Sequence, residues 1–163
     1  MTTSHQQRFE QCDKLLSATL HSCDLLLKAL HDERAAVKSR DPSALNDAVS
    51  RKKIHLAELE KHEKQRIALL EACNMPSDLE SMKRFVVKND NNEASLTRVW
   101  NATLKRLAEC RDANNTNGTI IASQRQMHSD AIDAIRQQEQ DPETYGPGGK
   151  TETTGQYRAL AEV

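Results

Sequence analysis

Apolar residues recur at a helical spacing in the first quarter of the chain. Those seven residues apart are Phe9, Leu16, Cys23, Leu30 and Val37, and those between them on the same face are Cys12, Leu20, Leu26 and Leu27. A seven-residue repeat is typical of an amphipathic helix with a coiled-coil-like seam. We expect this helix to end before Asp41-Pro42-Ser43, since the residue before a proline leaves helical geometry and Pro42 suits the first turn of the next helix. Because the connection is short, the helices on its two sides are predicted to run antiparallel.

A second helix is predicted from about Ser43 to Cys73. Its apolar seam consists of Leu45, Val49, Leu56, Leu59, Leu70 and Cys73, broadened by Ala48, Ile67 and Leu69. Lys52, Glu63 and Arg66 interrupt this seam, so it is either a partly solvated face or a place where charged groups of a partner are met. Met75-Pro76-Ser77 should end the helix. Ser77 and Glu80 have the spacing of a capping box, which predicts a short helix through about Val87.

A third long helix should follow the turn at Asn89-Asp90-Asn91-Asn92, capped by Asp90 with Glu93. Its seam steps by four and three through Leu96, Trp100, Thr103, Leu107, Cys110, Asn114, Asn117 and Ile121. Asn114 and Asn117 thus occupy positions that should be apolar. Either Asn114 to Gly118 forms a turn between two helices, or the helix continues and the asparagines form hydrogen bonds that fix its register. The local chemistry leaves both alternatives open.

The composition changes near the C-terminus. An apolar face continues to about Gln138, which suits either core packing or partner binding, and it consists of Ile120, Ile121, Met127, Ile132 and Ile135. We therefore expect a helical bundle over residues 1–138. Residues 139–163, with Tyr145-Gly146-Pro147-Gly148-Gly149, are predicted to be a flexible tail. Tyr157, Leu160 and Val163 are spaced for a last short amphipathic element.

Composition narrows the fold class to all-α. The 163 residues are 37% hydrophobic but only 3% aromatic, so one domain with an aliphatic core is expected. Five glycines and four prolines are too few for the turns of a β-rich fold. A net charge of -1 disfavours binding to nucleic acid or an anionic membrane surface. With neither a long apolar run nor a signal peptide, we expect a cytoplasmic protein without membrane insertion.

The sequence offers no candidate catalytic site, so we expect neither an enzyme nor a bound cofactor or metal. Cys12, Cys23, Cys73 and Cys110 lie on apolar stripes and are predicted to be reduced core residues. No histidine has a glutamate three positions before it, which excludes the usual carboxylate-bridged di-iron motif. His55, Glu58 and His62 share one helical face. Such a trio is more often a solvated stripe than a zinc site.

Three blocks of sequence resemble the FlgN family of flagellar export chaperones. The first runs from Leu25 to Leu70 and is similar to the two N-terminal helices of the family. The second is Asn114-x-x-Asn117-Gly118, followed by an apolar pair, and resembles the family's asparagine motif within an unbroken helix. The third, from Tyr145 to Thr151, is similar to its tail motif. The extra residues at the N-terminus and after Thr151 depart from shorter members.

The resemblance implies a long antiparallel bundle and a chaperone that binds the C-terminal helices of hook-associated proteins before their type III export. On this interpretation, Asn114, Asn117 and Gly118 set the register of a continuous helix. The expected client-binding residues are Ile120, Ile121, Met127, Ile132, Ile135, Tyr157 and Leu160. Tyr145 and Gly146 would contact the export apparatus.

Two other classes of protein remain as alternatives. One is a structural coiled-coil protein that oligomerises through the same seams without a client. Thr, Asn and Lys on these seams argue against a tight zipper but allow a weak homo-oligomer. The other is a small metal- or redox-sensing bundle that uses His55, His62 and the cysteines, which would show bound metal or thiol-dependent change.

Overall fold

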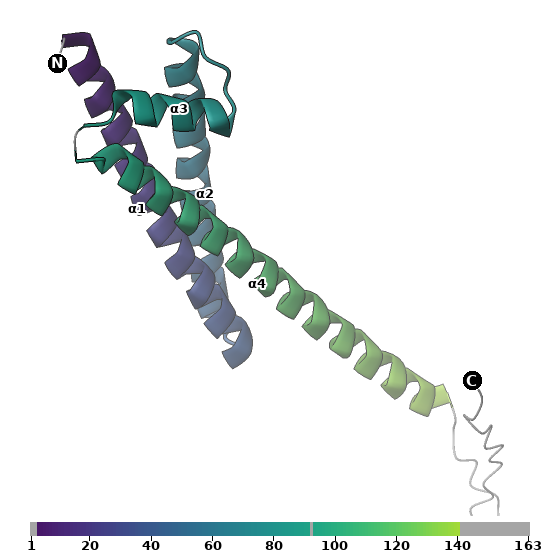
Figure 1. Cartoon of the computed structure of the whole chain (residues 1–163). Coiled ribbons are helices and arrows are strands. Elements are labelled where there is room, and N and C mark those ends of the chain that lie inside the picture. Colours follow the sequence, from purple (N-terminus) through teal and green to yellow (C-terminus); the bar gives the residue numbers. More distant parts are fainter. Residues whose placement is uncertain (1–2, 92, 141–163) are drawn as a thin grey trace, which may run out of the picture. The chain divides into compact units, whose positions relative to one another are not determined.

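The computed structural model describes residues 3–91 and 93–140 of the chain, with side chains for residues 5–91 and 93–137. Within these residues the chain forms helices and no strand. The helices are α1 (Thr3–Ser39), α2 (Pro42–Glu71), α3 (Leu79–Asn89) and α4 (Ser95–Gln140) (Figure 1). The predicted all-α fold, three long helices and one short one, is thus confirmed. No helix in this part of the chain is long and apolar enough to span a membrane.

The corner between α1 and α2 is built as its sequence predicts. The Asp41 carboxylate accepts a hydrogen bond of 3.0 Å from the backbone N–H of Ala44, and Pro42 is the first residue of α2. Arg40 takes a left-handed conformation with φ of 55°, and the N–H of Asp41 donates to the carbonyl of Ala36. These bonds satisfy groups that helix ends otherwise leave unpaired. The two helices run antiparallel, as expected (Figure 1).

The cap of α3 differs from the predicted Ser77–Glu80 box. Asp78, one residue later, is the N-cap, and its carboxylate accepts a hydrogen bond of 2.7 Å from the N–H of Ser81. This bond is the main reason why the pKa of Asp78 lies below its ordinary value. Ser77 instead accepts a bond of 2.6 Å from Arg66 through its carbonyl oxygen, a long-range contact that local pattern does not reveal. The helix then extends two residues beyond the predicted end, to Asn89.

Asp90 caps α4, as predicted, but without Glu93. Its carboxylate accepts hydrogen bonds of 2.9 Å from the N–H groups of both Leu96 and Thr97, and another from the Thr97 hydroxyl. Although desolvation raises the pKa of Asp90, these bonds outweigh it and hold the pKa below its ordinary value. The Asn91 side chain supplies the acceptor for the N–H groups of Glu93 and Ser95.

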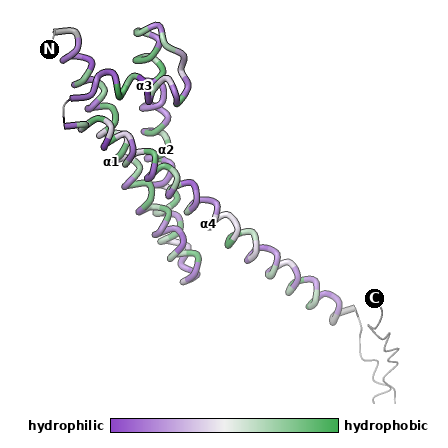
Figure 2. The backbone as a smooth tube through the Cα atoms, in the orientation of Figure 1, coloured by the Kyte–Doolittle hydropathy of each residue, from purple (hydrophilic) through white to green (hydrophobic). Residues whose placement is uncertain are grey.

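Two apolar clusters form the core. The larger joins all four helices and consists of Cys12, Leu15, Leu16, Leu69, Leu70, Met82, Phe85, Val86, Leu96 and Trp100. The smaller lies between α1 and α4 and consists of Cys23, Leu26, Leu30, Cys110 and Ala113. Hydrophobic and hydrophilic positions alternate along each helix, as expected for amphipathic helices (Figure 2).

The buried seam of α4 departs from the predicted heptad positions. Leu107 is 39% exposed and Asn114 is exposed, whereas Ala113 is buried. A straight α-helix has 3.6 residues per turn, so its buried face drifts away from a strict 3.5-residue repeat. Asn117 remains on the buried face.

The chain divides into two compact units, residues 1–121 and residues 122–163. The first contains the two core clusters. In the second, the structure describes α4 from Ala122 to Gln140. The expected boundary between bundle and tail, at residue 138, stays a prediction, and residues 141–163 of the expected tail (139–163) lie outside the described residues.

Candidate functional site

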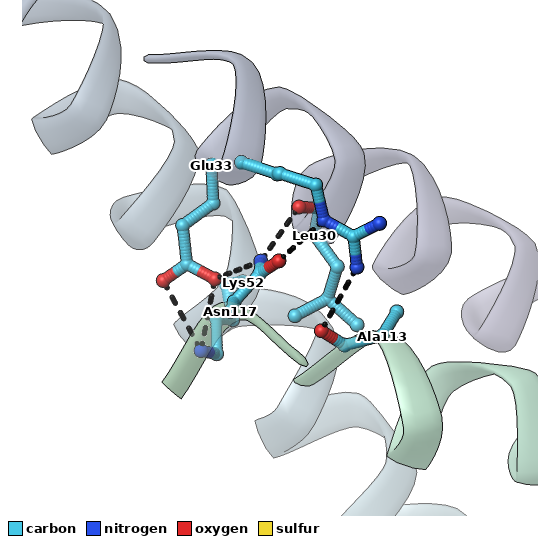
Figure 3. Close-up of polar contacts among 6 residues, drawn as sticks. Leu30, Glu33, Lys52, Ala113 and Asn117 are labelled. Carbon is cyan, nitrogen blue, oxygen red and sulfur yellow. Dashed lines mark hydrogen bonds and ion pairs between the residues drawn. The ribbon is translucent and has the colours of Figure 1, made fainter. Parts of the chain in front are cut away.

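Asn117 is the centre of a buried polar network in the first unit. Its side chain is 2% exposed, and its amide nitrogen donates to the carbonyl oxygen of Leu30 at 2.8 Å and to Glu33 Oε2 at 2.7 Å. Figure 3 shows these groups converging between three helices. A buried amide costs free energy unless its hydrogen bonds are made, so this arrangement ties the position of α4 to that of α1.

Charged side chains complete the network from two helices. Arg34 Nε donates to Asn117 Oδ1 at 2.9 Å, and Arg34 Nη2 donates to the carbonyl oxygen of Ala113 at 3.3 Å. Lys52 Nζ lies 3.2 Å from both oxygens of Glu33, whose side chain is 4% exposed (Figure 3). Lys52, which interrupts the predicted seam of α2, therefore neutralises an almost fully buried carboxylate inside the protein.

The network bears on the two alternatives for the asparagine segment. Helix α4 continues without a turn from Ser95 to Gln140, so the continuous-helix alternative is correct. Asn117 makes the cross-helix hydrogen bonds, whereas Asn114 is exposed. No atom outside its own helix lies within 4 Å of a side chain built at Gly118. The expected register role of the three residues stays a prediction, for which Asn117 has the contacts.

Sequence reasoning missed Glu33 and Arg34 as parts of this network. Glu33 lies three residues after Leu30 and four before Val37, at a seam position of α1 that should be apolar. The same kind of anomaly drew attention to Asn117. Polar residues on two facing seams indicate that their side chains contact each other. Which residues form the pair, however, depends on the register of α1 and α4.

The four cysteines are free thiols, and three of them are buried. Cys12, Cys23 and Cys110 belong to the two core clusters, whereas Cys73 is half-buried. Cys110 Sγ donates to the carbonyl oxygen of Cys23 at 3.3 Å. The side-chain hydrogen bond between the two thiols raises the pKa of Cys23 and lowers that of Cys110. Burial raises the pKa of Cys12 to about 12, so this thiol remains protonated.

The predicted trio of histidines and glutamate does not converge on a metal position. In residues 5–91 and 93–137, no three His, Cys, Asp or Glu side chains are grouped so that they can hold a metal ion. His62 is half-buried between α1 and α2, where it lines two grooves.

The expected client-binding residues on α4 fall into two groups. Ile120 and Ile121, at the end of the first unit, are half-buried. Met127, Ile132 and Ile135, in the second unit, are exposed by 66%, 50% and 57%. These three lie within an arc of about 140° at 100° per residue, so they form one stripe. We call Met127, Ile132 and Ile135 the apolar stripe of α4.

Polar residues occupy the opposite side of this helical segment and bond to each other. Gln126 Nε2 donates to Asp130 at 2.7 Å, and Arg136 lies 3.9 Å from Asp133. The segment is therefore amphipathic, with its large apolar side chains on one face. The remaining expected site residues, Tyr145, Gly146, Tyr157 and Leu160, lie outside the described residues.

The sequence matches the family model described as FlgN protein over residues 1–153. The chain belongs to the FlgN family. A match that includes the asparagine segment, the apolar stripe and the Tyr145–Thr151 motif confirms the resemblance found in the sequence. No curated protein and no solved structure matches the chain.

Membership of the FlgN family defines the general class of function. FlgN proteins are chaperones of flagellum biogenesis and not enzymes, which gives this chain a general role as a flagellar export chaperone. The four-helix architecture and the exposed apolar stripe are compatible with a protein that binds other proteins.

Proposed function

We propose that this FlgN chain binds the C-terminal amphipathic helices of flagellar hook-associated proteins in the cytoplasm. By covering these helices it prevents premature assembly, and it delivers the bound proteins to the flagellar type III export apparatus. The proposal refines the chaperone role given by the family. The observation that carries it is the exposure of Met127, Ile132 and Ile135 on one face of α4.

The chemistry of the apolar stripe suits an amphipathic helix as client. Three large aliphatic side chains that are each at least half exposed leave apolar surface in water, and burying such surface releases about 25 cal/mol for each Å². An amphipathic helix presents apolar residues at spacings of three and four along one face, so it can pack its apolar face against such a stripe. Subunits that assemble through such helices expose the same kind of surface before assembly, so a helical chaperone can cover it.

Ile120 and Ile121, at the end of the first unit, are proposed to bind the client as well. Their partial burial means that they contribute to folding as well, so their substitution affects both stability and binding. Tyr157 and Leu160 are proposed to add contacts from the tail, and Tyr145 with Gly146 to contact the export apparatus.

Titration calorimetry with the C-terminal segments of hook-associated proteins tests this proposal. We expect saturable binding of about one client per chain, weakened about tenfold or more by Ile132→Asp with Ile135→Asp. A matched control, Ser129→Asp with Gln137→Asp, adds the same charge at exposed positions outside the apolar stripe. This control should bind within about twofold of the wild type while circular dichroism shows equal helicity.

Two outcomes would contradict the proposal. Absence of binding by the folded full-length chain would leave a structural coiled-coil protein as the better interpretation, and sedimentation would then reveal a homo-oligomer. An equal loss of client affinity in the control variant would mean that added charge, rather than disruption of the apolar stripe, weakens binding. Truncation after Gln138 separates the contribution of the tail from that of the helix.

A further inference from the structure

A groove of about 600 Å³ lies between the N-terminal half of α1 and the C-terminal half of α2. Polar side chains line it from both helices, namely Arg8, Gln11 and Lys14 from α1 and Lys61, His62 and Gln65 from α2. Its apolar part consists of Leu15, Ala18, Ala68, Leu69, Ala72 and Cys73. We call this the α1–α2 groove. Its residues differ from those of the apolar stripe of α4.

The charge of the α1–α2 groove differs from that of the chain as a whole. The protein has 23 basic and 24 acidic residues, yet Arg8, Lys14 and Lys61 line the groove and no carboxylate does. Within the described residues, none of these three cations lies within 4 Å of a carboxylate. Other cations of the first unit, such as Lys52 and Arg106, are paired with carboxylates. The side chains that line the groove therefore carry positive charge and no negative charge.

The apolar part of the groove allows a bound helix to approach α1 and α2 closely. Ala18, Ala68 and Ala72 are small, so the backbone of a bound helix can come near α1 and α2. Leu15 and Leu69 are buried core residues and provide firm support. A polyphosphate chain would use the cations but not this apolar surface, which favours a ligand that is both apolar and acidic.

Exposed hydrophobic residues continue the same faces along both helices. Leu25 lies seven residues after Ala18 on α1 and is 37% exposed, and Ile54 lies seven residues before Lys61 on α2 and is 60% exposed. Residues seven apart lie on nearly the same side of an α-helix. The surface available to a ligand thus combines a cationic groove with apolar positions beyond it.

We propose that the α1–α2 groove binds an acidic amphipathic helix of a partner protein. The apolar ridge of this helix packs on the alanines and leucines, and its carboxylates pair with Lys14 and Lys61. Charge complementarity of this kind sets the orientation and raises the association rate of a complex. The proposal concerns a second binding surface and does not rest on client binding by the apolar stripe of α4.

Two synthetic peptides test the proposal on the full chain. Both are amphipathic helices of about 18 residues, or five turns, with the same leucine ridge, flanked by glutamates in one and by lysines in the other. Fluorescence anisotropy with the full-length variant Ile132→Asp with Ile135→Asp, whose apolar stripe is disrupted, should show saturable binding of the glutamate peptide alone. Cys73 lines the groove, so bound peptide should also slow its alkylation about fivefold or more as the site is covered.

Charge reversal localises the interaction. Lys14→Glu with Lys61→Glu should weaken binding of the glutamate peptide about tenfold or more. The control, Lys83→Glu with Lys105→Glu, changes exposed lysines of α3 and α4 that do not line the groove and should remain within about twofold. The glutamate peptide should protect Cys73 equally in the wild type and in Ile132→Asp with Ile135→Asp, which separates this proposal from that of client binding.

The proposal would be overturned if the two peptides bound with equal affinity. It would also be overturned if both charge-reversed variants lost the same amount of affinity for the glutamate peptide. Binding that leaves the alkylation rate of Cys73 unchanged would place the peptide elsewhere and overturn it too. Displacement by inorganic phosphate at constant ionic strength would instead identify a simple anion site.

Discussion

Asn117 on α4 donates a hydrogen bond of 2.7 Å to Glu33 on α1, although the two residues are 84 positions apart in the sequence. Both lie at seam positions that a helical bundle normally fills with apolar side chains. The bond places a charged acceptor beside a buried amide, and Lys52 supplies the neutralising charge from α2. Three helices thus contribute groups to one buried network, and each of these groups would pay a desolvation cost without its partners.

Replacement of Asn117 by alanine should lower the free energy of unfolding by about 2–3 kcal/mol, since Glu33 and the carbonyl of Leu30 lose a donor in a buried place. Urea denaturation followed by circular dichroism measures this change. The control is Asn114→Ala, on the same helix but exposed, which should change stability by less than about 0.5 kcal/mol. Equal effects of the two substitutions would show that the network does not determine register.

Gly118→Ala should stabilise the protein by about 0.5–1 kcal/mol. Glycine is a poor residue inside a helix, and space for a methyl group is open beside Gly118. Thermal or urea denaturation measures the gain. A loss of stability would indicate that the backbone at this position needs glycine. Stabilisation combined with weaker client binding would assign the glycine to the close approach of a partner.

Asp90→Ala should reduce the free energy of unfolding by about 1–2 kcal/mol near neutral pH, because two N–H groups at the start of α4 lose their acceptor. Glu93→Ala is the control, because Glu93 makes no side-chain hydrogen bond among the described residues and should have little effect. A large effect of Glu93→Ala would instead support the cap predicted from sequence.

The contribution of Asp90 should also depend on pH. Its pKa is lower in the folded protein than the ordinary value of 3.8, so folding favours the ionised carboxylate. The stabilisation is therefore fully present above about pH 4 and is lost as the pH falls through the folded-state pKa. Urea denaturation from pH 7 to pH 3 should show wild type and Asp90→Ala converging at the acidic end. A constant difference over this range would contradict the role of the ionised group.

Cys73 should react with a thiol reagent at least about tenfold faster than the other cysteines of the folded protein. Cys73 is half-buried, whereas the other three are enclosed in the core, and burial raises the pKa of Cys12 to about 12. Mass spectrometry after timed alkylation at pH 8 identifies the modified residue. Cys73→Ser should remove the fast phase, and all remaining thiols should react on unfolding in urea. A fast phase that persists in Cys73→Ser would place the accessible thiol elsewhere.

Much of the fold follows from local pattern. The apolar spacing predicts the long helices, and Asp41-Pro42 marks the corner, since a proline fixes backbone geometry and removes a donor wherever it occurs. The predicted capping box shows the limit of local reasoning. Ser77 fits the motif, but Asp78 is the cap, and Arg66, from the preceding helix, bonds to the Ser77 carbonyl.

The apolar positions on α4 are visible in the sequence, but their environments are not. Ile120 and Ile121 are half-buried, while Met127, Ile132 and Ile135 are exposed, although all five are aliphatic residues at helical spacing. The spacing of apolar residues indicates that one face of a helix is apolar, but it does not indicate which other element covers that face. The α1–α2 groove is likewise absent from the sequence pattern, since its cations come from two helices whose alignment depends on packing.

The helices, the corner after α1, the position of the anomalous asparagines and membership of the FlgN family can all be read from the order of residues alone. These features depend on residues close together in the chain or on motifs in fixed order. The burial of Asn117 rather than Asn114, and the position of Glu33, Arg34 and Lys52 around it, depend on how the helices pack. The physical reason is that a buried polar group selects its partners in space, and the register of packed helices sets which residues come within hydrogen-bonding distance.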